Sequence, residues 1–599
     1  MKRKIGAAQN SAQQSMLGGA MILTAALMLV KVIGLVYKLP LANAYSMEGK
    51  GYFSNAFDIY LPIYAIALTG LPVAVSRMVS QRCAEGLFRD AREIYKVARE
   101  LFLMVGVVGT VLLLAMAYPF SRYVASSGPE SVWSILAIAP TIFFCCAMSA
   151  YRGYYEGLRN MVPTAVSQVI EAFIKAVLGL VLAMMVMKRG LAEFAASGTV
   201  FGSPAANEDI ANAMLYPWAS AAAILGITVG SVVGLIYLFL RHHLRGDGIA
   251  QAMLLEAPAP QPRKKLLREM VTIAIPMVLS AVILNVTNLI DVINVNHLLG
   301  RCVERYPDVI VQIYGTAFQL KGTLPENYAG YIWGVYNTAL DFRTLIPTIV
   351  TALGVSALPA IAAAWTLHNK ETVHKTVNTV LRIAMMISLP AGFGMAVLSK
   401  EIMTLFYEKD NPGMAQHAAP MMMLFGVATA LMAVSAPVIS MLQGIGRTDV
   451  PVKSLIAGTV VKIGVNYLLV SNPRINVNGA AIGTVLFYVV IVSYNLFMLL
   501  RVSKTRVRWG SVLAKPLFCA CLSAAAAWLA SSLAQRFAPR FAESGRLVLL
   551  VAVLGAIALA VLVYGAAMLL CRGLMEDDLE ILPGGKKIGK VLAKYGLLG

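Results

Sequence analysis

The chain has 599 residues, of which 58% are hydrophobic and 13% are charged, and its mean hydropathy is +0.72. Soluble domains carry about 25% charged residues, so this composition excludes an ordinary soluble enzyme. The formal net charge of +20 does not require a nucleic-acid partner, because basic loops of a membrane protein face anionic lipid headgroups.

Apolar stretches long enough to cross a bilayer recur along the whole chain. The N-terminal run from Met16 is too long for a signal peptide and contains Lys31 and Lys38, so we interpret it as a retained first span. The sequence predicts an all-α membrane protein with about fourteen transmembrane helices. The expected spans are 15–40, 54–80, 98–121, 131–155, 162–187, 213–241, 269–299, 331–364, 376–399, 417–443, 452–471, 479–501, 513–533 and 546–572.

Basic residues are concentrated in the segments that follow the even-numbered spans, above all spans 2, 6, 12 and 14. The positive-inside rule then places both termini in the cytoplasm and the protein in the cytoplasmic (inner) membrane. Residues 85–99 follow span 2. They are expected to form either an amphipathic helix on the membrane surface or an extension of span 3 into water.

Landmarks of the first half recur 287 residues later in the second half. The pairs are Leu71-Pro72 with Leu358-Pro359, Gly157 with Gly444, and Lys175 with Lys462. A period of six spans keeps both halves in one orientation, so we predict two six-helix lobes related by a parallel repeat. The expected parts are an N-lobe (1–241), a stiff Pro-rich cytoplasmic linker (242–268), a C-lobe (269–501), and spans 13 and 14 with a cytoplasmic tail (502–599).

Charged side chains inside the predicted spans are candidate functional groups, because each costs about 2.5–3.5 kcal/mol at membrane depth even on lenient scales. Lys31 has no acidic residue three or four positions away, so it is expected to face a polar cavity. Lys38 lies near the outer interface and either reaches water or joins Lys31. Asp341 and Arg343 are two residues apart and point in different directions on a helix, so at least one should face the lumen.

Two further groups have structural alternatives. Glu171 and Lys175 are four residues apart on one helix face and are predicted to form a structural ion pair. Span 7 carries polar side chains at three-residue spacing, which would hold a cation such as Na⁺, line a polar path, or make hydrogen bonds between helices. They are Asn285, Asn288, Asp291 and Asn294. The seven cysteines show no metal or redox spacing, so no metal and no cofactor are expected.

Several motifs, taken in order, resemble one family. In the first half they are Lys31-Val-Ile-Gly-Leu-Val-Tyr-Lys-Leu-Pro40, Gly51-Tyr-Phe-Ser-Asn-Ala-Phe-Asp-Ile-Tyr60, Gly70-Leu-Pro-Val-Ala-Val-Ser-Arg-Met78, Tyr151-Arg-Gly-Tyr-Tyr-Glu-Gly157 and Pro163-Thr-Ala-Val-Ser-Gln-Val-Ile-Glu171. In the second half they are Gln443-Gly-Ile-Gly-Arg-Thr-Asp449 and Asn478-Gly-Ala-Ala-Ile-Gly-Thr484. The chain resembles the polysaccharide-exporter branch of the multidrug/oligosaccharidyl-lipid/polysaccharide flippase superfamily. Within that branch it resembles the stage V sporulation protein B and MurJ-type lipid II flippases.

The resemblance implies movement of an undecaprenyl-pyrophosphate-linked sugar precursor from the inner to the outer leaflet, with roles in peptidoglycan synthesis or sporulation. It implies a cationic cavity that includes Lys31 and, approximately, Lys38, Asp341 and Arg343. A sodium site of some relatives would fall near Asp291, Asn288 and Asn466. Lys462, however, occupies the position where a second acidic side chain would help to bind the cation. The coupling ion is therefore expected to be Na⁺ or H⁺.

We predict a monomeric flippase, not an enzyme, whose partners are a lipid-linked oligosaccharide and membrane lipids. Lipid II is the first choice of cargo. The alternatives are a cation-coupled multidrug exporter of the same superfamily and a membrane-embedded glycosyl or phosphoryl transferase. A drug exporter should have a more acidic cavity, and a transferase should show paired carboxylates in a long polar loop. The sequence has basic intramembrane charges and only scattered loop acids.

Overall fold

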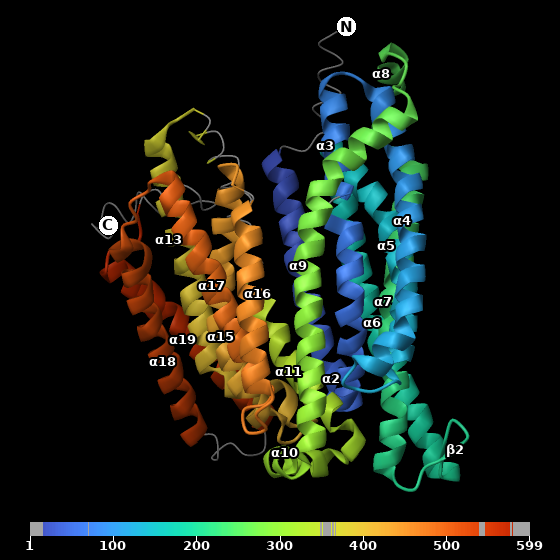
Figure 1. Ribbon diagram of the computed structural model, residues 1–599, viewed down its shortest axis with the longest axis vertical. Coiled ribbons are helices and arrows are strands. Elements are labelled where there is room, and N and C mark those ends of the chain that lie inside the picture. The colour runs from blue at the N-terminus through green and yellow to red at the C-terminus, as the bar shows by residue number, and fades with distance from the viewer. Residues whose placement is uncertain are drawn as a thin grey trace. The chain divides into compact units, whose positions relative to one another are not determined.

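The computed structural model describes residues 16–69, 71–344, 346–347, 350, 361, 364–365, 367–447, 449–537, 545–575 and 578. These residues are nearly all helical, with one two-stranded antiparallel hairpin formed by β1 (Thr199–Val200) and β2 (Ser203–Pro204) (Figure 1). They group into two compact units. Unit 1 holds the described residues up to His297 together with Lys321–Gly334, and unit 2 holds Leu298–Leu320 and the described residues from Val335 onward. The four-part division expected from the sequence stays a prediction.

The helices of unit 1 are α2 (Met16–Thr69), α3 (Leu71–Ala84), α4 (Phe88–Tyr123), α5 (Ser131–Gly157), α6 (Val162–Ser197), α7 (Glu208–Arg245), α8 (Gln251–Glu256), most of α9 (Arg263–Arg305), η1 (Pro325–Asn327) and the first half of α11 (Tyr328–Asp341). Those of unit 2 are α10 (Pro307–Lys321) but for its last residue, the second half of α11, η2 (Phe342–Thr344), α13 (Lys370–Val397), α14 (Ser399–Met403), the π-helical turn η3 (Thr404–Glu408), α15 (Met414–Gly444), α16 (Asp449–Val470), α17 (Asn478–Ser503), the π-helical turn η4 (Gly510–Ala514), α18 (Lys515–Phe537) and α19 (Gly545–Leu570).

Ten helices in the described part of the chain are long and apolar enough to cross a membrane. The predicted spans 1 and 2 both lie largely in α2, where Tyr45 and Ser46 leave the helical conformation and break it into two segments. The expected count of fourteen remains a prediction. Most of predicted span 8 beyond Pro347, including the Leu358-Pro359 landmark, lies outside the described residues.

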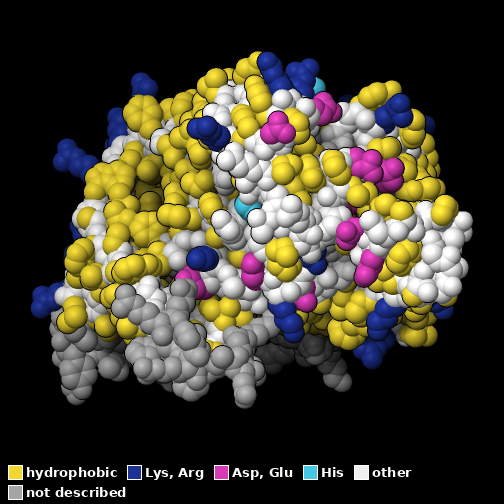
Figure 2. Space-filling model, turned by 90° about the horizontal axis from the view of Figure 1, so that it is seen from below, with side chains coloured by type: hydrophobic (Ala, Val, Ile, Leu, Met, Phe, Trp, Pro, Cys, Tyr) yellow, Lys and Arg dark blue, Asp and Glu magenta, His cyan; other side chains and the backbone are white. Residues whose placement is uncertain are grey.

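Helix α4 shows how the units meet lipid. Its buried residues recur every three or four positions, namely Phe102, Gly106, Gly109, Leu113 and Ala117. Its opposite face is exposed and apolar, with Met104 66% and Val108 61% exposed. Figure 2, which looks from below onto an end of the helices, shows hydrophobic side chains mixed with charged and other groups. A surface as apolar as the exposed face of α4 is compatible with lipid and not with water.

Helices α5 and α7 lie side by side in unit 1 and run in the same direction (Figure 1). Three side-chain contacts join them, each between residues 86 or 87 apart in the sequence, and this constant offset makes the two helices parallel. The contacts are Ser134 with Ser220 (2.9 Å), Thr141 with Thr228 (2.8 Å) and Cys145 with Ser231 (3.6 Å). Hydrogen bonds of this kind fix the register of packed membrane helices.

The linker that follows α7 is held on unit 1. We call residues 246–262 the linker strap. Asp247 accepts two hydrogen bonds from Arg92 (2.6 and 3.0 Å) and one from the Tyr154 hydroxyl (2.9 Å). Farther along, Arg89 donates to the carbonyl of Leu254 (2.7 Å). Helix α4 is continuous from Phe88, so the segment at 88–99 is the extension of span 3, and the strap packs against it.

Candidate functional site

The helix that carries Asp341 and Arg343 is interrupted at these residues. Helix α11 ends at Asp341 and continues as the short 3₁₀ turn η2. Pro347 has no N–H, so it cannot donate to the carbonyl of Arg343 four residues earlier. The hydroxyl of Thr429 in α15 donates to that carbonyl instead, at 3.2 Å. The sequence thus replaces a backbone hydrogen bond with a contact to a neighbouring helix, which fixes this turn in place.

The Arg343 side chain is half-buried, and its Nε is buried with no acceptor among the described residues. A buried donor of a charged group without a partner is costly unless an anion or water completes it. Asp341 has contacts of its own and lies within electrostatic range of the buried Tyr407. Arg343 is therefore the group of this pair that is available to a ligand.

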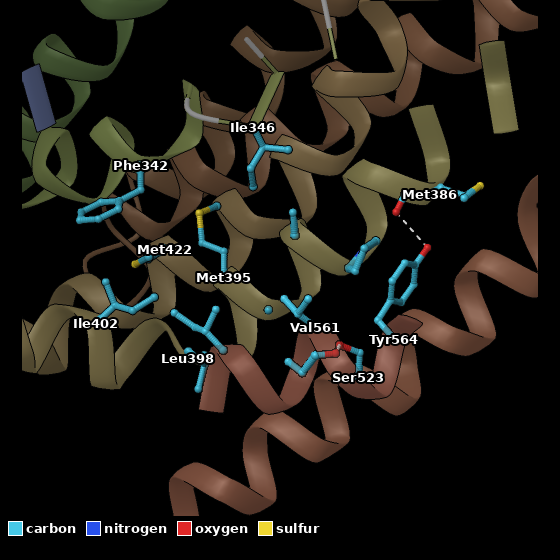
Figure 3. A pocket seen from close by; sticks show the side chains of 15 residues that line it. Phe342, Ile346, Met386, Met395, Leu398, Ile402, Met422, Ser523, Val561 and Tyr564 are labelled. Carbon is cyan, nitrogen blue, oxygen red and sulfur yellow. Dashed lines mark hydrogen bonds between the residues drawn. The ribbon is translucent and has the colours of Figure 1, made fainter. Parts of the chain in front are cut away.

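Phe342, the residue before Arg343, lines an apolar cavity of about 460 Å³ (Figure 3). Its lining residues come from η2 and the turn after it, and from helices α13, α14, α15, α18 and α19. They are Phe342, Ile346, Met386, Pro390, Ala391, Gly394, Met395, Leu398, Ile402, Met422, Ser523, Ile557, Ala560, Val561 and Tyr564. The Tyr564 hydroxyl donates to the Met386 carbonyl (2.9 Å), and the Ser523 hydroxyl donates to the Ala560 carbonyl (2.8 Å). Since both hydroxyls are engaged by backbone, the cavity presents an almost purely hydrocarbon surface.

Unit 1 contains a buried ion pair that joins α5 to α6. Arg152 is 6% exposed and donates to Glu171 at 3.0 Å and to the Ser167 hydroxyl at 3.0 Å. The other carboxylate oxygen of Glu171 accepts from Ser231 of α7 at 3.2 Å. The sequence did contain a signal for this pair: Glu171 lies inside a predicted span, and Arg152, nineteen residues earlier, is a second basic residue that could reach it.

Lys175 lies against aromatic rings of α2. Its Nζ is 5.9 Å from the ring centroid of Tyr37 and 5.6 Å from that of Phe57. Rings stabilise a desolvated ammonium group through their negative faces. The structure therefore gives Glu171 a cation other than its predicted partner, and the Glu171–Lys175 pair stays a prediction.

The other predicted residues are distributed over both units. Lys31 is exposed on the first half of α2, and the side chain of Lys38 lies outside the described part. Asn288 and Asp291 lie on α9 in unit 1, whereas Asn466 is fully buried on α16 in unit 2. Lys462, one turn before Asn466, has its Nζ 5.8 Å from the ring centroid of Phe487. The predicted cation site and the predicted common cavity of Lys31, Lys38, Asp341 and Arg343 remain predictions.

The fold resembles that of solved membrane transporters. It resembles the solved inward-closed lipid II flippase MurJ, with a TM-score of 0.57, 12% identity, and coverage of 91% of this chain and 98% of that chain. It also resembles an inward-facing multidrug-resistance transporter of the MATE family, with a TM-score of 0.56, 15% identity, and coverage of 80% of this chain and 100% of that chain.

Sequence comparison leads to particular relatives. Residues 328–544 match the family "Lipid II flippase MurJ", and residues 16–207 match the family "Polysaccharide biosynthesis protein". The lipid II flippase MurJ of Bacillus subtilis is 24% identical over 81% of this chain and 82% of its own length. The stage V sporulation protein B of the same organism is 23% identical over 79% of this chain and 81% of its own length. The resemblance predicted from the ordered motifs is confirmed.

Proposed function

We propose that this protein is a flippase that moves an undecaprenyl-pyrophosphate-linked sugar precursor, lipid II as first choice, across the cytoplasmic membrane by alternating access. The observation that carries the proposal lies within unit 2. Arg343, whose buried Nε has no acceptor among the described residues, directly follows Phe342, which lines a hydrocarbon cavity. A ligand that matches both features has an anionic head next to a long apolar chain.

The head requires cations because a pyrophosphate loses its hydration when it enters a low-dielectric interior. Arg343 offers a forked guanidinium that grips phosphate oxygens, and lysines offer mobile point charges. We propose that Lys31, Lys38 and Asp341 join Arg343 around the head. Asp341 would limit the net positive charge there, so that binding remains reversible.

The apolar chain requires a hydrocarbon surface. Burial contributes about 0.8 kcal/mol per methylene group, so even part of a polyprenyl chain would add several kcal/mol of binding free energy. The cavity between α13, α18 and α19 supplies such a surface without a free polar atom. The remainder of the chain would stay in the bilayer.

The architecture that we propose for this function has fourteen spans in two six-helix lobes, a parallel repeat, two added C-terminal helices and cytoplasmic termini. The parallel course of α5 and α7 supports it, because predicted spans 4 and 6 must cross in one direction. A reporter fused at residue 255 should be active only in the cytoplasm, and periplasmic or extracellular activity would contradict this topology.

We further propose a monomer coupled to Na⁺ or H⁺, with Asp291, Asn288 and Asn466 as the candidate ion ligands.

A multidrug exporter is the second candidate, favoured by the nearly equal likeness of the fold to a multidrug-resistance transporter. One experiment separates the two. The protein is depleted in cells that rely on it, and lipid-linked precursors and their exposure at the outer surface are measured. A flippase predicts that one precursor accumulates and disappears from the outer surface. Normal precursor exposure together with hypersensitivity to cationic drugs would instead establish the exporter. A transferase would change the chemical structure of a precursor rather than its side of the membrane.

A further inference from the structure

After α19, the described residues 571–575 and 578 form a turn that contacts α13 and α18. Arg572 adopts a left-handed conformation (φ 49°), and the N–H of Gly573 donates to the carbonyl of Met568 at 2.8 Å. This is the Schellman pattern that ends a helix and turns the chain. We call residues 571–575 and 578 the C-terminal hook.

A buried, two-pronged ion pair fastens this hook to α13. Arg382 and Asp578 are 2% and 1% exposed. The guanidinium donates to both carboxylate oxygens, with distances of 2.9 and 2.8 Å from Nε and 2.6 Å from Nη2. The N–H of Met575 also donates to Asp578 (2.9 Å), and the Lys515 ammonium of α18 donates to the Arg572 carbonyl (2.9 Å). The hook thus connects α13, α18 and α19.

The hook lies next to one end of the apolar cavity. Met386 and Tyr564 mark the limit of the cavity on α13 and α19. Both pack against a small hydrophobic cluster with Cys519 and Met568, both buried, and Cys571, the first residue of the hook. Arg382 comes one helical turn before Met386. Along α13, the ion pair therefore comes first, the hydrophobic cluster follows it, and the cavity comes last. The end of the cavity next to the ion pair faces the cytoplasm in the predicted topology.

We propose that Arg382 and the C-terminal hook form a latch that fixes the α18–α19 hairpin on α13 and closes this end of the apolar cavity to water. Arg382 and Asp578 are positioning residues: they keep the wall that α19 contributes in place. The physical reason is that a dry cavity binds hydrocarbon, whereas an opening at the cytoplasmic end would admit water. The inference rests on the proposed function only for the identity of the molecule that occupies the apolar cavity.

The test uses labelling instead of transport, so a failure of the latch and a failure of the proposed function are distinguishable. Ala391→Cys places a thiol on the α13 wall of the cavity in the full chain, reconstituted in lipid nanodiscs. Labelling of the peptide that contains position 391 is followed by mass spectrometry. One reagent is a charged methanethiosulfonate and the other is lipid-soluble N-ethylmaleimide. In the otherwise unaltered chain, the charged reagent should react at 391 at least about tenfold more slowly than at a thiol introduced at the exposed Lys453 of α16.

Asp578→Asn and Arg382→Gln should each raise the rate with the charged reagent about tenfold, because one buried charge then lacks its partner and the latch opens. Arg382→Lys should give a smaller rise. Asp449→Asn is the matched control, since it breaks an exposed pair with Arg447 in the same unit and should change nothing.

If both latch variants fail to fold, Lys515→Met removes a single exposed contact of the hook and should still raise the rate measurably. Unchanged charged-reagent rates in folded latch variants, or fast labelling at 391 in the unaltered latch, would overturn the proposal.

Discussion

The guanidinium of Arg152 lies 3.0 Å from the carboxylate of Glu171, and this pair connects α5 to α6 inside unit 1. Breaking a buried pair by removing one partner leaves an uncompensated charge. Arg152→Met and Glu171→Gln are therefore expected to lower the free energy of unfolding by about 3–5 kcal/mol each. Lys175→Met should cost about 0.5–2 kcal/mol, because it removes contacts with aromatic rings. Chemical unfolding in detergent, followed by tryptophan fluorescence, measures these differences.

Double-mutant cycles decide which cation is the partner of Glu171. The coupling energy of Arg152 with Glu171 should exceed that of Glu171 with Lys175. Equal or reversed coupling energies would restore the pair that the sequence predicts.

Thr429 and Pro347 act on the same carbonyl, that of Arg343. Thr429→Val leaves this buried acceptor without a donor and should cost about 1–3 kcal/mol of stability. Pro347→Ala supplies a backbone N–H four residues after Arg343, so the double variant should recover part of that loss. Thermal unfolding of the four proteins gives the coupling. Strict additivity would show that the two residues do not share this carbonyl.

Lys31 and Arg343 should be required for transport and not for folding. Combined replacement of both by Ala should abolish precursor exposure at the outer surface, while Lys31→Arg and Arg343→Lys each retain part of it, because charge is kept and geometry is changed. The measurement is labelling of the precursor from outside in cells that depend on each variant, with the amount of protein in the membrane as the control. Normal exposure in the double Ala variant would exclude these residues as the headgroup site.

Asp247 makes the linker strap sensitive to acid. Burial raises the pKa of its carboxyl, but hydrogen bonds from Arg92, the Ile249 N–H and Tyr154 outweigh burial and lower the pKa below the ordinary value of 3.8. A lowered pKa in the folded state contributes stability above the ordinary pKa, and this contribution is lost as the pH falls through the folded value. Asp247→Asn should therefore destabilise the protein at pH 7 by about 1–3 kcal/mol and by less at pH 3. Thermal unfolding at the two pH values tests this, and an equal loss at both would contradict it.

The helical membrane fold was predictable because composition and apolar length report it directly, and the ordered motifs identified the family. Spans 4 and 6 were also expected to run in one direction, as α5 and α7 do. The partner of Glu171 was not predictable, because local spacing favours a cation four residues away, whereas Arg152 reaches it from another helix. The hook was missed for the same reason: 196 residues separate Arg382 from Asp578, and no periodicity connects them. The contact that completes the Arg343 carbonyl was not predictable either, because Thr429 reaches it from α15, 86 residues away in the sequence.

The three contacts between α5 and α7 have a mechanical consequence. A slide of one helix past the other by a single turn would break the contacts of Ser134, Thr141 and Cys145 together, because all three share one register. This part of unit 1 therefore resists shear and transmits force as a stiff block. Any change of shape during transport must be absorbed elsewhere, where the backbone already departs from regular helix, as at Tyr45 and Ser46 in α2.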